Sequence, residues 1–265
     1  MARLTWPNGA RCAVCLTFDN LGEAFDRRVY GHAAGMASEG QYAVRAGVPR
    51  LLDLFDRQGV KVTFFSEGWN GEHNAALIRE AVQRGHEVAA HGWMHEQWNE
   101  LAPDLERDLL TRATSALEQA AGVRPAGWRS PSGLMTERTI PLLRELGYRY
   151  DTSFMDDDLP YPMAGSGQGL IQLPWTWEID DAVYYAHGRG NIVAPEVVEA
   201  HWRADFDACY EELGYWMLVG HSRFSGRPAR ARALERLIEH IKRHEGVWFA
   251  RCDELAEWVR KLAAE

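Results

Sequence analysis

The sequence predicts an α/β fold built around a mostly parallel sheet that curls into a barrel. Short runs of apolar, β-branched or aromatic residues recur along the 265 residues, and each is followed by a stretch with helical periodicity. This alternation is the pattern of repeated βα units. Eight such runs suggest a barrel. No stretch rich in Pro or Ser marks a linker, so we expect a single domain over residues 1–265.

The expected strands begin with the apolar run RCAVCLTF and end with VWFA. In chain order they are 11–18, 60–66, 86–91, 126–129, 148–150, 170–174, 215–220 and 247–250. The expected helices are 47–58, 73–84, 103–121, 136–146, 195–213, 228–243 and 252–263. Pro103 and Asp104 open the third of these helices, where proline is favourable. Glycines suited to a left-handed cap follow four helical runs, at Gly59, Gly85, Gly122 and Gly147.

Two segments lack the alternating pattern. Residues 20–46 are rich in Gly and Ala without a strong period, and 151–194 are interrupted by an Asp triplet and by Gly-Ser-Gly. We expect both to be long loops, and long loops in compact domains are usually functional.

Composition limits the partners and the location of the protein. The chain has 29 Lys and Arg residues against 38 Asp and Glu residues, a formal net charge of −9, which argues against a surface that binds nucleic acid. No window holds the roughly 18 apolar residues of a membrane span, and residues 1–10 do not resemble a signal peptide. We therefore expect a cytoplasmic protein whose partners are neither nucleic acid nor membrane.

Four cysteines are too few for a disulfide framework, which agrees with a reducing compartment. Cys12 and Cys15 form a CxxC, but they lie within an apolar run, and no second CxxC exists to complete a zinc site. We expect both to be buried as small hydrophobic residues.

Polar residues gather where the expected strands end, which is where βα barrels carry their chemistry. Asp19 follows the first strand and can be a general base or the cap of a turn. His91 and His95, at i and i+4, can hold one metal ion or be unrelated. Arg129 can orient a carboxylate or form a structural ion pair, and His221 can be a general acid or a core histidine. Their occurrence together at one rim favours the functional interpretation.

The order and spacing of these residues resemble the motifs of the polysaccharide deacetylase superfamily, also called the NodB-homology or carbohydrate esterase family 4 superfamily. The five matching segments are Thr17-Phe18-Asp19-Asn20, His91-Gly-Trp-Met-His95, Arg129-Ser-Pro-Ser-Gly133, Asp151-Thr-Ser-Phe-Met and the apolar strand that ends in His221. The resemblance is closer to the branch with cytoplasmic peptidoglycan-deacetylase-like proteins, cyclic imide hydrolases and metal-independent allantoinases. Its marks are residues 150–161, 173–181, 225–230 and 246–250.

The resemblance implies a distorted (β/α)7 barrel that hydrolyses a C–N bond. Carried onto this chain, Asp19 would be the general base and Arg129 the group that orients it. His221 would be the acid that protonates the leaving nitrogen, and Asp151 would belong to the same catalytic set.

The resemblance also implies a divalent metal ion, with Zn²⁺ as our expectation. His91 and His95 would be its histidine ligands, and Asn20 would contribute an amide oxygen. Most deacetylases have a carboxylate at the position of Asn20, and the closer branch often has one at the position of Leu21, so this chain departs from the pattern.

Substrate contacts are expected from Pro131 in the third motif, from Trp175 and from Ser222, which stands where the closer branch usually has proline. Aromatic residues over 151–185 can form a pocket wall or can be core and subunit contacts. Relatives in the closer branch are often homotetramers, so a homo-oligomer is expected.

The leading hypothesis is a metal-dependent amidohydrolase that acts on a small amide, imide or N-acetyl substrate. A second hypothesis keeps the hydrolysis but drops the metal, as in allantoinase-like relatives, with Asn20 as the mark of lost coordination. A third is a barrel that binds a ligand without turnover, and the joint presence of Asp19, Arg129 and His221 counts against it.

Overall fold

The architecture is a mostly parallel sheet curled into a distorted barrel, in a computed structural model that describes residues 4–186 and 192–264. The strands are β1 Cys12–Asp19, β2 Thr63–Ser66, β3 Glu87–Ala90, β4 Gly127–Trp128, β5 Tyr150–Asp151, β6 Tyr161–Pro162, β7 Ile171–Gln172, β8 Tyr215–His221 and β9 Val247–Phe249. Their order is β6-β7-β5-β4-β3-β2-β1-β8, with β9 paired to β1, and β6 alone is antiparallel to its neighbour. The predicted distorted (β/α)7 barrel is thus confirmed.

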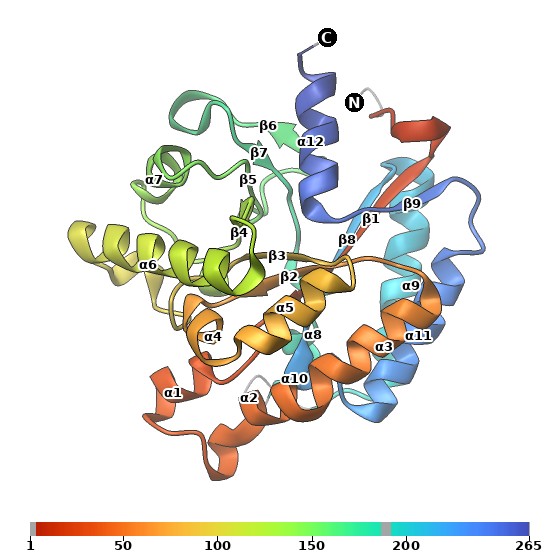
Figure 1. Ribbon diagram of the computed structural model, residues 1–265. Coiled ribbons are helices and arrows are strands. Elements are labelled where there is room, and N and C mark those ends of the chain that lie inside the picture. Colours follow the sequence, from red (N-terminus) through yellow and green to blue (C-terminus); the bar gives the residue numbers. More distant parts are fainter. Residues whose placement is uncertain (1–3, 187–191, 265) are drawn as a thin grey trace.

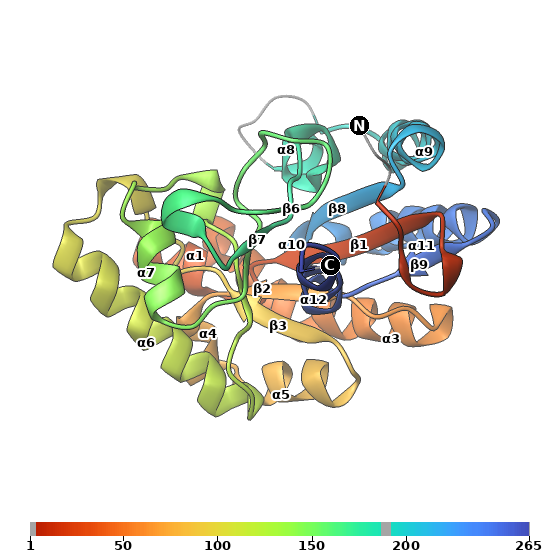
Figure 2. The same ribbon diagram turned by 90° about the horizontal axis from the view of Figure 1, so that it is seen from above.

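Helices surround the sheet on its outer side. Their bounds are α1 Ala24–Tyr30, α2 Glu39–Tyr42, α3 Val48–Gln58, α4 Gly68–His73, α5 Ala75–Gln83, α6 Pro103–Ala121, α7 Thr139–Glu145, α8 Asp181–Tyr185, α9 Pro195–Glu212, α10 Ser222–Ser225, α11 Pro228–Ile241 and α12 Cys252–Leu262. Figure 2 shows α6, α5, α3 and α11 around the outside of the sheet and α12 over its middle. Within the described residues, no helix has the length and apolar character needed to cross a bilayer.

β1 is the central strand, and its sequence explains why. All of its residues are buried, as expected for a continuous apolar run in a parallel sheet that is covered on both faces. The amino-terminal half of β1 pairs with β9, its carboxyl-terminal half pairs with β2, and the whole strand pairs with β8. In this register Asp19 lies beside His221. Because parallel strands end at the same edge of a sheet, the register itself brings these two side chains together.

The two ends of the barrel are covered differently. α12 lies at the end where the strands begin, and α1, α2, α8 and α10 lie at the opposite end (Figure 1). The backbone N–H groups of Cys252 and Asp253, at the start of α12, donate to Thr63 Oγ1 at 2.8 Å and to Glu87 Oε2 at 2.9 Å. Thr63 and Glu87 begin β2 and β3, so α12 closes the amino-terminal end of the barrel and leaves the carboxyl-terminal end for the site.

All eight expected strands and all seven expected helices occur, mostly with shorter bounds. Gly59 and Gly122 end α3 and α6 in the left-handed conformation, with φ of 59° and 74°, as predicted. Cys12 and Cys15 are buried, as predicted, and neither takes part in a disulfide. The antiparallel β6 and the helices α4 and α10 were not expected from the sequence.

The expectation of a loop over 20–46 is wrong, because this segment contains α1 and α2. Their short lengths explain why no period is visible in the sequence. Of the segment 151–194, residues 187–191 lie outside the described residues. The remainder contains β6, β7 and α8, each five residues or shorter.

Candidate active site

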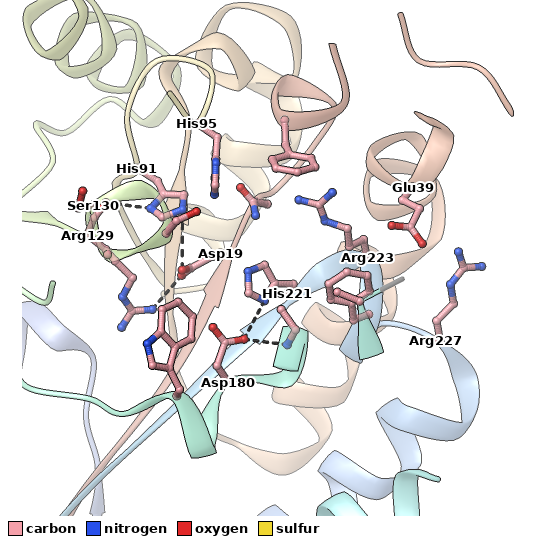
Figure 3. A pocket seen from close by; sticks show the side chains of 18 of the residues that line it. Asp19, Glu39, His91, His95, Arg129, Ser130, Asp180, His221, Arg223 and Arg227 are labelled. Atoms are coloured by element: carbon pink, nitrogen blue, oxygen red, sulfur yellow. Dashed lines mark hydrogen bonds and ion pairs between the residues drawn. The ribbon is translucent and has the colours of Figure 1, made fainter. Parts of the chain in front are cut away.

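A cavity with a volume of about 510 Å³ opens at the carboxyl-terminal end of the described sheet, and this volume is within the range of small-molecule sites. Its floor comes from the ends of β1, β3, β4 and β8, and its walls come from α1, α2, α8 and α10. Figure 3 shows that predicted site residues from separate strands point into this cavity. Those that line it are Asp19, Asn20, His91, His95, Arg129, Trp175 and His221.

Asp19 is held by Arg129. The Arg129 Nη1 group donates to Asp19 Oδ1 at 2.8 Å and also to Thr17 Oγ1 at 2.8 Å. Its Nη2 group donates to Thr152 Oγ1 at 3.2 Å, and its guanidinium carbon lies 4.3 Å from the centre of the Phe65 ring. With these contacts on several sides, the buried guanidinium has a fixed position. It therefore fixes one oxygen of Asp19 and leaves the other, Oδ2, directed toward the cavity and 3.9 Å from His91 Nε2.

His91 and His95 form a neutral pair. His91 Nδ1 lies 2.8 Å from the backbone oxygen of Arg129, and we assign the proton to Nδ1 because a carbonyl can only accept. Nε2 of His91 then carries a lone pair. Burial lowers the pKa of His91 to about 4 and lowers the pKa of His95 well below its usual value, so both rings are neutral near pH 7.

The pair has features that suit a metal ion. The two ring centres are 5.0 Å apart. Within the described part of the chain, the buried Nδ1 of His95 has no hydrogen-bond partner, and an orphaned buried nitrogen is costly unless something binds it. His95 also has a φ of 63°, a conformation that is strained for a residue with a Cβ. Neutral imidazoles are the ligands that Zn²⁺ and similar ions prefer, so the two histidines fit a divalent metal.

Asn20 fits less well, because both ends of its amide have protein partners. In the orientation that satisfies both neighbours, its nitrogen donates to Glu67 Oε1, and its oxygen accepts from Arg223 Nη2 at 2.9 Å. Burial raises the pKa of Glu67 to about 8, so this carboxyl is mostly protonated and neutral near pH 7. An amide oxygen can accept a second bond, but a metal ion there would lie beside the positive charge of Arg223.

His221 is held by a residue that we did not place in the site from the sequence. Its Nδ1 lies 2.7 Å from Asp181 Oδ1, and its backbone N–H donates to Asp181 Oδ2 at 2.9 Å. Burial lowers the pKa of His221, but the nearby carboxylates of Asp180, Asp181 and Asp19 outweigh this, and the pKa is raised overall. With Nδ1 bound to Asp181, the proton on Nε2 is the one available to the cavity.

Three predicted site residues do not line this cavity. Asp151 is buried and accepts from Ser153 N at 2.9 Å and from Ser153 Oγ at 2.7 Å, so it supports the backbone behind the site. Pro131 is buried, and Ser130, its neighbour, lines the cavity in its place. Ser222 is fully buried, and its Oγ has no partner among the described residues.

Sequence reasoning missed Asp180, Asp181 and Arg223 as members of the site. The signal for the first two was visible, since adjacent Asp residues follow the expected strand 170–174. Arg223 gave no signal, because its effect depends on a contact with Asn20 that joins two distant segments.

Asp19 and His221 thus face one cavity from neighbouring strands, and a carboxyl group and an imidazole so placed suit acid–base chemistry. The profile of the polysaccharide deacetylase family matches residues 8–150, more than half of the chain. The chain belongs to the polysaccharide deacetylase family.

Relatives and solved structures agree with this assignment. A peptidoglycan deacetylase of Helicobacter pylori is 29% identical over 251 residues, which cover 83% of this chain and 86% of that protein. The crystal structure of a Mycobacterium smegmatis protein described as a polysaccharide deacetylase is 37% identical, with a TM-score of 0.93 over 99% of this chain and 95% of the other. The allantoinase PuuE is 29% identical, with a TM-score of 0.84 over 97% of this chain and 92% of the other.

Proposed function

We propose that this chain hydrolyses a C–N bond in a small amide, imide or N-acetyl compound, with Asp19 as the base and His221 as the acid. The observation that carries the proposal is that these two groups lie on neighbouring strands and have partners of opposite charge. The base is held by a guanidinium, and the acid is held by a carboxylate. Arg129 holds Asp19 at 2.8 Å, while Asp181 holds His221 at 2.7 Å. The cavity of about 510 Å³ favours a small substrate, and a peptidoglycan fragment is the polymer alternative to test.

In this reaction water attacks the carbonyl carbon of the substrate and loses a proton to Asp19 Oδ2. The new C–O bond gives a tetrahedral oxyanion. As the C=O bond re-forms, the C–N bond breaks, and His221 Nε2–H donates its proton to the departing nitrogen. Arg129 keeps the Asp19 carboxylate in position throughout, since its own bonds to Thr17 and Thr152 do not involve the substrate.

A divalent metal, with Zn²⁺ as the expectation, would be held by His91 and His95 with Asn20 as a third ligand. Such an ion would supply Lewis acidity toward the substrate carbonyl. The matching tautomer of His91 and the orphaned nitrogen of His95 support this part of the proposal.

The metal-free variant of the same hydrolysis is a second candidate, and one contact favours it. Arg223 Nη2 donates to the oxygen of Asn20, so a fixed cation already lies beside the third ligand. Metal analysis of the purified protein, together with activity in excess chelator, separates the two candidates.

The test of the function is a substrate panel of hydantoins, succinimides, allantoin, N-acetyl sugars and a peptidoglycan fragment, with and without added Zn²⁺. We expect turnover of at least one small compound. His221→Ala should reduce turnover least for imides, whose leaving nitrogen is already a stable anion, and His201→Ala, an exposed histidine on α9, is the control. If none of the compounds is hydrolysed, either with or without metal, the proposal is overturned and a barrel that only binds a ligand is favoured.

Location in the cytoplasm and assembly into a homo-oligomer, such as a tetramer, stay predictions. Molar mass measured by light scattering during size-exclusion chromatography tests the second.

A further inference from the structure

Away from the cavity, two histidines and one aspartate converge on the outer surface of the barrel. Asp207 lies on α9, and His240 and His244 lie at the end of α11 and just beyond it. His240 Nε2 is 2.6 Å from Asp207 Oδ1, and His244 Nε2 is 3.3 Å from the same oxygen. The three side chains are between 19% and 42% exposed, so an ion from solvent can reach them.

The hydrogen bonds of His244 leave a lone pair directed at the carboxylate. Nδ1 of His244 lies 3.2 Å from the backbone oxygen of His240, and a carbonyl requires the proton to be on Nδ1. In a neutral His244, Nε2 then has no proton and faces Asp207, which can only accept. A metal ion between Nε2 and the carboxylate would bind to both of these acceptors.

Aromatic packing fixes the two imidazoles. The His244 ring lies 5.0 Å from the Phe206 ring and 4.8 Å from the Tyr210 ring, and the His240 ring lies 6.2 Å from Phe206. The rings are therefore held with their Nε2 atoms toward Asp207 before any ion binds. Two atoms bound to one tetrahedral zinc ion at about 2.0–2.1 Å lie about 3.3 Å apart. The His244 distance matches this value, and the half-exposed Asp207 can move to open the shorter distance to His240.

We propose that Asp207, His240 and His244 form a second divalent-cation site, which takes Zn²⁺ or a similar transition metal and links α9 to α11. Two imidazoles and one carboxylate are a donor set that suits zinc, with one position open to water. Earlier along the same two helices, Glu199 on α9 accepts from Arg236 Nε on α11 at 2.8 Å. The ion would add a second link between these helices, about one turn further along α11.

The proposed site is distinct from the cavity. Asp207 is near the carboxyl end of α9, which leads into the start of β8, whereas His221 ends β8. Seven residues of strand span roughly 20 Å, so the ion would lie at the other end of β8. Its role is structural, because it joins the two helices that flank the strand carrying the acid.

The two metal proposals are separated by variants of the full chain. After removal of metal with a chelator, Zn²⁺ binding is measured by equilibrium dialysis near neutral pH for the wild type, for His91→Gln with His95→Gln, and for His240→Gln with His244→Gln. We expect the variant without the cavity histidines to keep one bound Zn²⁺ and to melt at a higher temperature with Zn²⁺ than without. Adding the two outer substitutions to that variant should weaken this binding by at least about 100-fold, since even partners outside the ligand set contribute about 10- to 100-fold.

His201→Gln, which changes an exposed histidine of α9 outside the proposed site, is the matched control and should leave binding unchanged. If the outer double variant does not fold, Asp207→Asn tests the same ion through an exposed side chain, with the same expected loss. The proposal is overturned if the folded variant that lacks His91 and His95 binds no Zn²⁺. It is also overturned if that variant binds Zn²⁺ and the outer substitutions leave the affinity unchanged. Failure of the cavity to bind Zn²⁺ affects the proposed function alone.

Discussion

Asp181→Asn tests whether Asp181 orients the ring of His221, the proposed acid, or acts on it only through its negative charge. Asp181 is fully buried and accepts three hydrogen bonds, from His221 Nδ1, from the His221 backbone N–H and from Ser225 Oγ. An asparagine has one accepting oxygen where the carboxylate has two. If that oxygen serves Nδ1, the backbone N–H of His221 faces an amide N–H. If it serves the backbone, the amide donates to Nδ1 and forces the neutral ring into the other tautomer.

The size of the effect follows from these partners. A buried donor left without an acceptor costs about 1–3 kcal/mol of unfolding free energy. Loss of one adjacent carboxylate should lower the pKa of His221, because that carboxylate raises it. Turnover should fall by up to about 10²- to 10⁴-fold, the full worth of a positioned acid.

The dependence on pH has a definite sign. The folded-state pKa of His221 is raised by its carboxylates despite burial, so its protonated form stabilises the fold. That contribution is complete below the unfolded pKa of about 6.5 and is lost as the pH rises through the folded pKa. The difference in unfolding free energy between wild type and variant should therefore be largest near pH 6 and should narrow as the solution becomes alkaline.

Asp180→Asn is the matched control. Asp180 lies 3.6 Å from His221 Nδ1 and caps α8 by accepting from Ala182 N at 2.7 Å, and asparagine can keep that cap. This change removes the same charge without removing the bond to Nδ1. Nitrogen NMR of histidine-labelled protein reports the pKa and the tautomer of His221 without any substrate. An equal pKa decrease and the same tautomer in both variants would refute an orienting role for Asp181.

Three further predictions concern the base, the third metal ligand and the packing below the site. Asp19→Asn should lower kcat by about 10²- to 10⁴-fold with little change in KM, and near-normal kcat on a confirmed substrate would exclude Asp19 as the base. The same change should lower the unfolding free energy by about 3–5 kcal/mol, because it leaves the charge of the buried Arg129 unpaired. Asn20→Asp should strengthen Zn²⁺ binding in a chelator competition, because it adds a negative charge beside two histidines; unchanged affinity would remove residue 20 from the ligand set. Gly127→Ala should destabilise the fold by at least about 1–3 kcal/mol in urea denaturation, because its Cβ would lie 1.8 Å from the Tyr150 ring; wild-type stability would contradict the packing described.

The sequence predicted the strands well because parallel strands are marked by local apolar runs. β1 and β8 are recognisable from their own residues, since every position in both is buried. The short elements were missed for a physical reason. α1 and α8 have seven and five residues, too few for a helical period to emerge from the background. Their positions depend on packing at the cavity, which the local sequence does not specify.

The site residues were likewise predictable only where the local sequence specifies their position. Asp19, His91, Arg129 and His221 were predictable because each comes directly at a strand end, where the topology brings them together. Asp151 also ends a strand, yet its carboxylate bonds to Ser153 and lies away from the cavity. Position at a strand end thus places a residue at the rim but does not determine the direction of its side chain.

The strength of metal binding at the cavity cannot be predicted from the motif residues alone. Asn20 in place of a carboxylate predicts weaker metal binding, because the ligand set loses one negative charge. The structure adds a second cause, since Arg223 places a positive charge on the oxygen of that same amide. Both features weaken metal binding. The positive charge of Arg223 repels a cation, and residue 20 lacks the carboxylate that would offset this repulsion. Arg223 follows the acid His221 by two residues and comes from a different strand end. The predicted weakness of metal binding at the cavity therefore depends on two distant segments together, and the first motif alone does not reveal both causes.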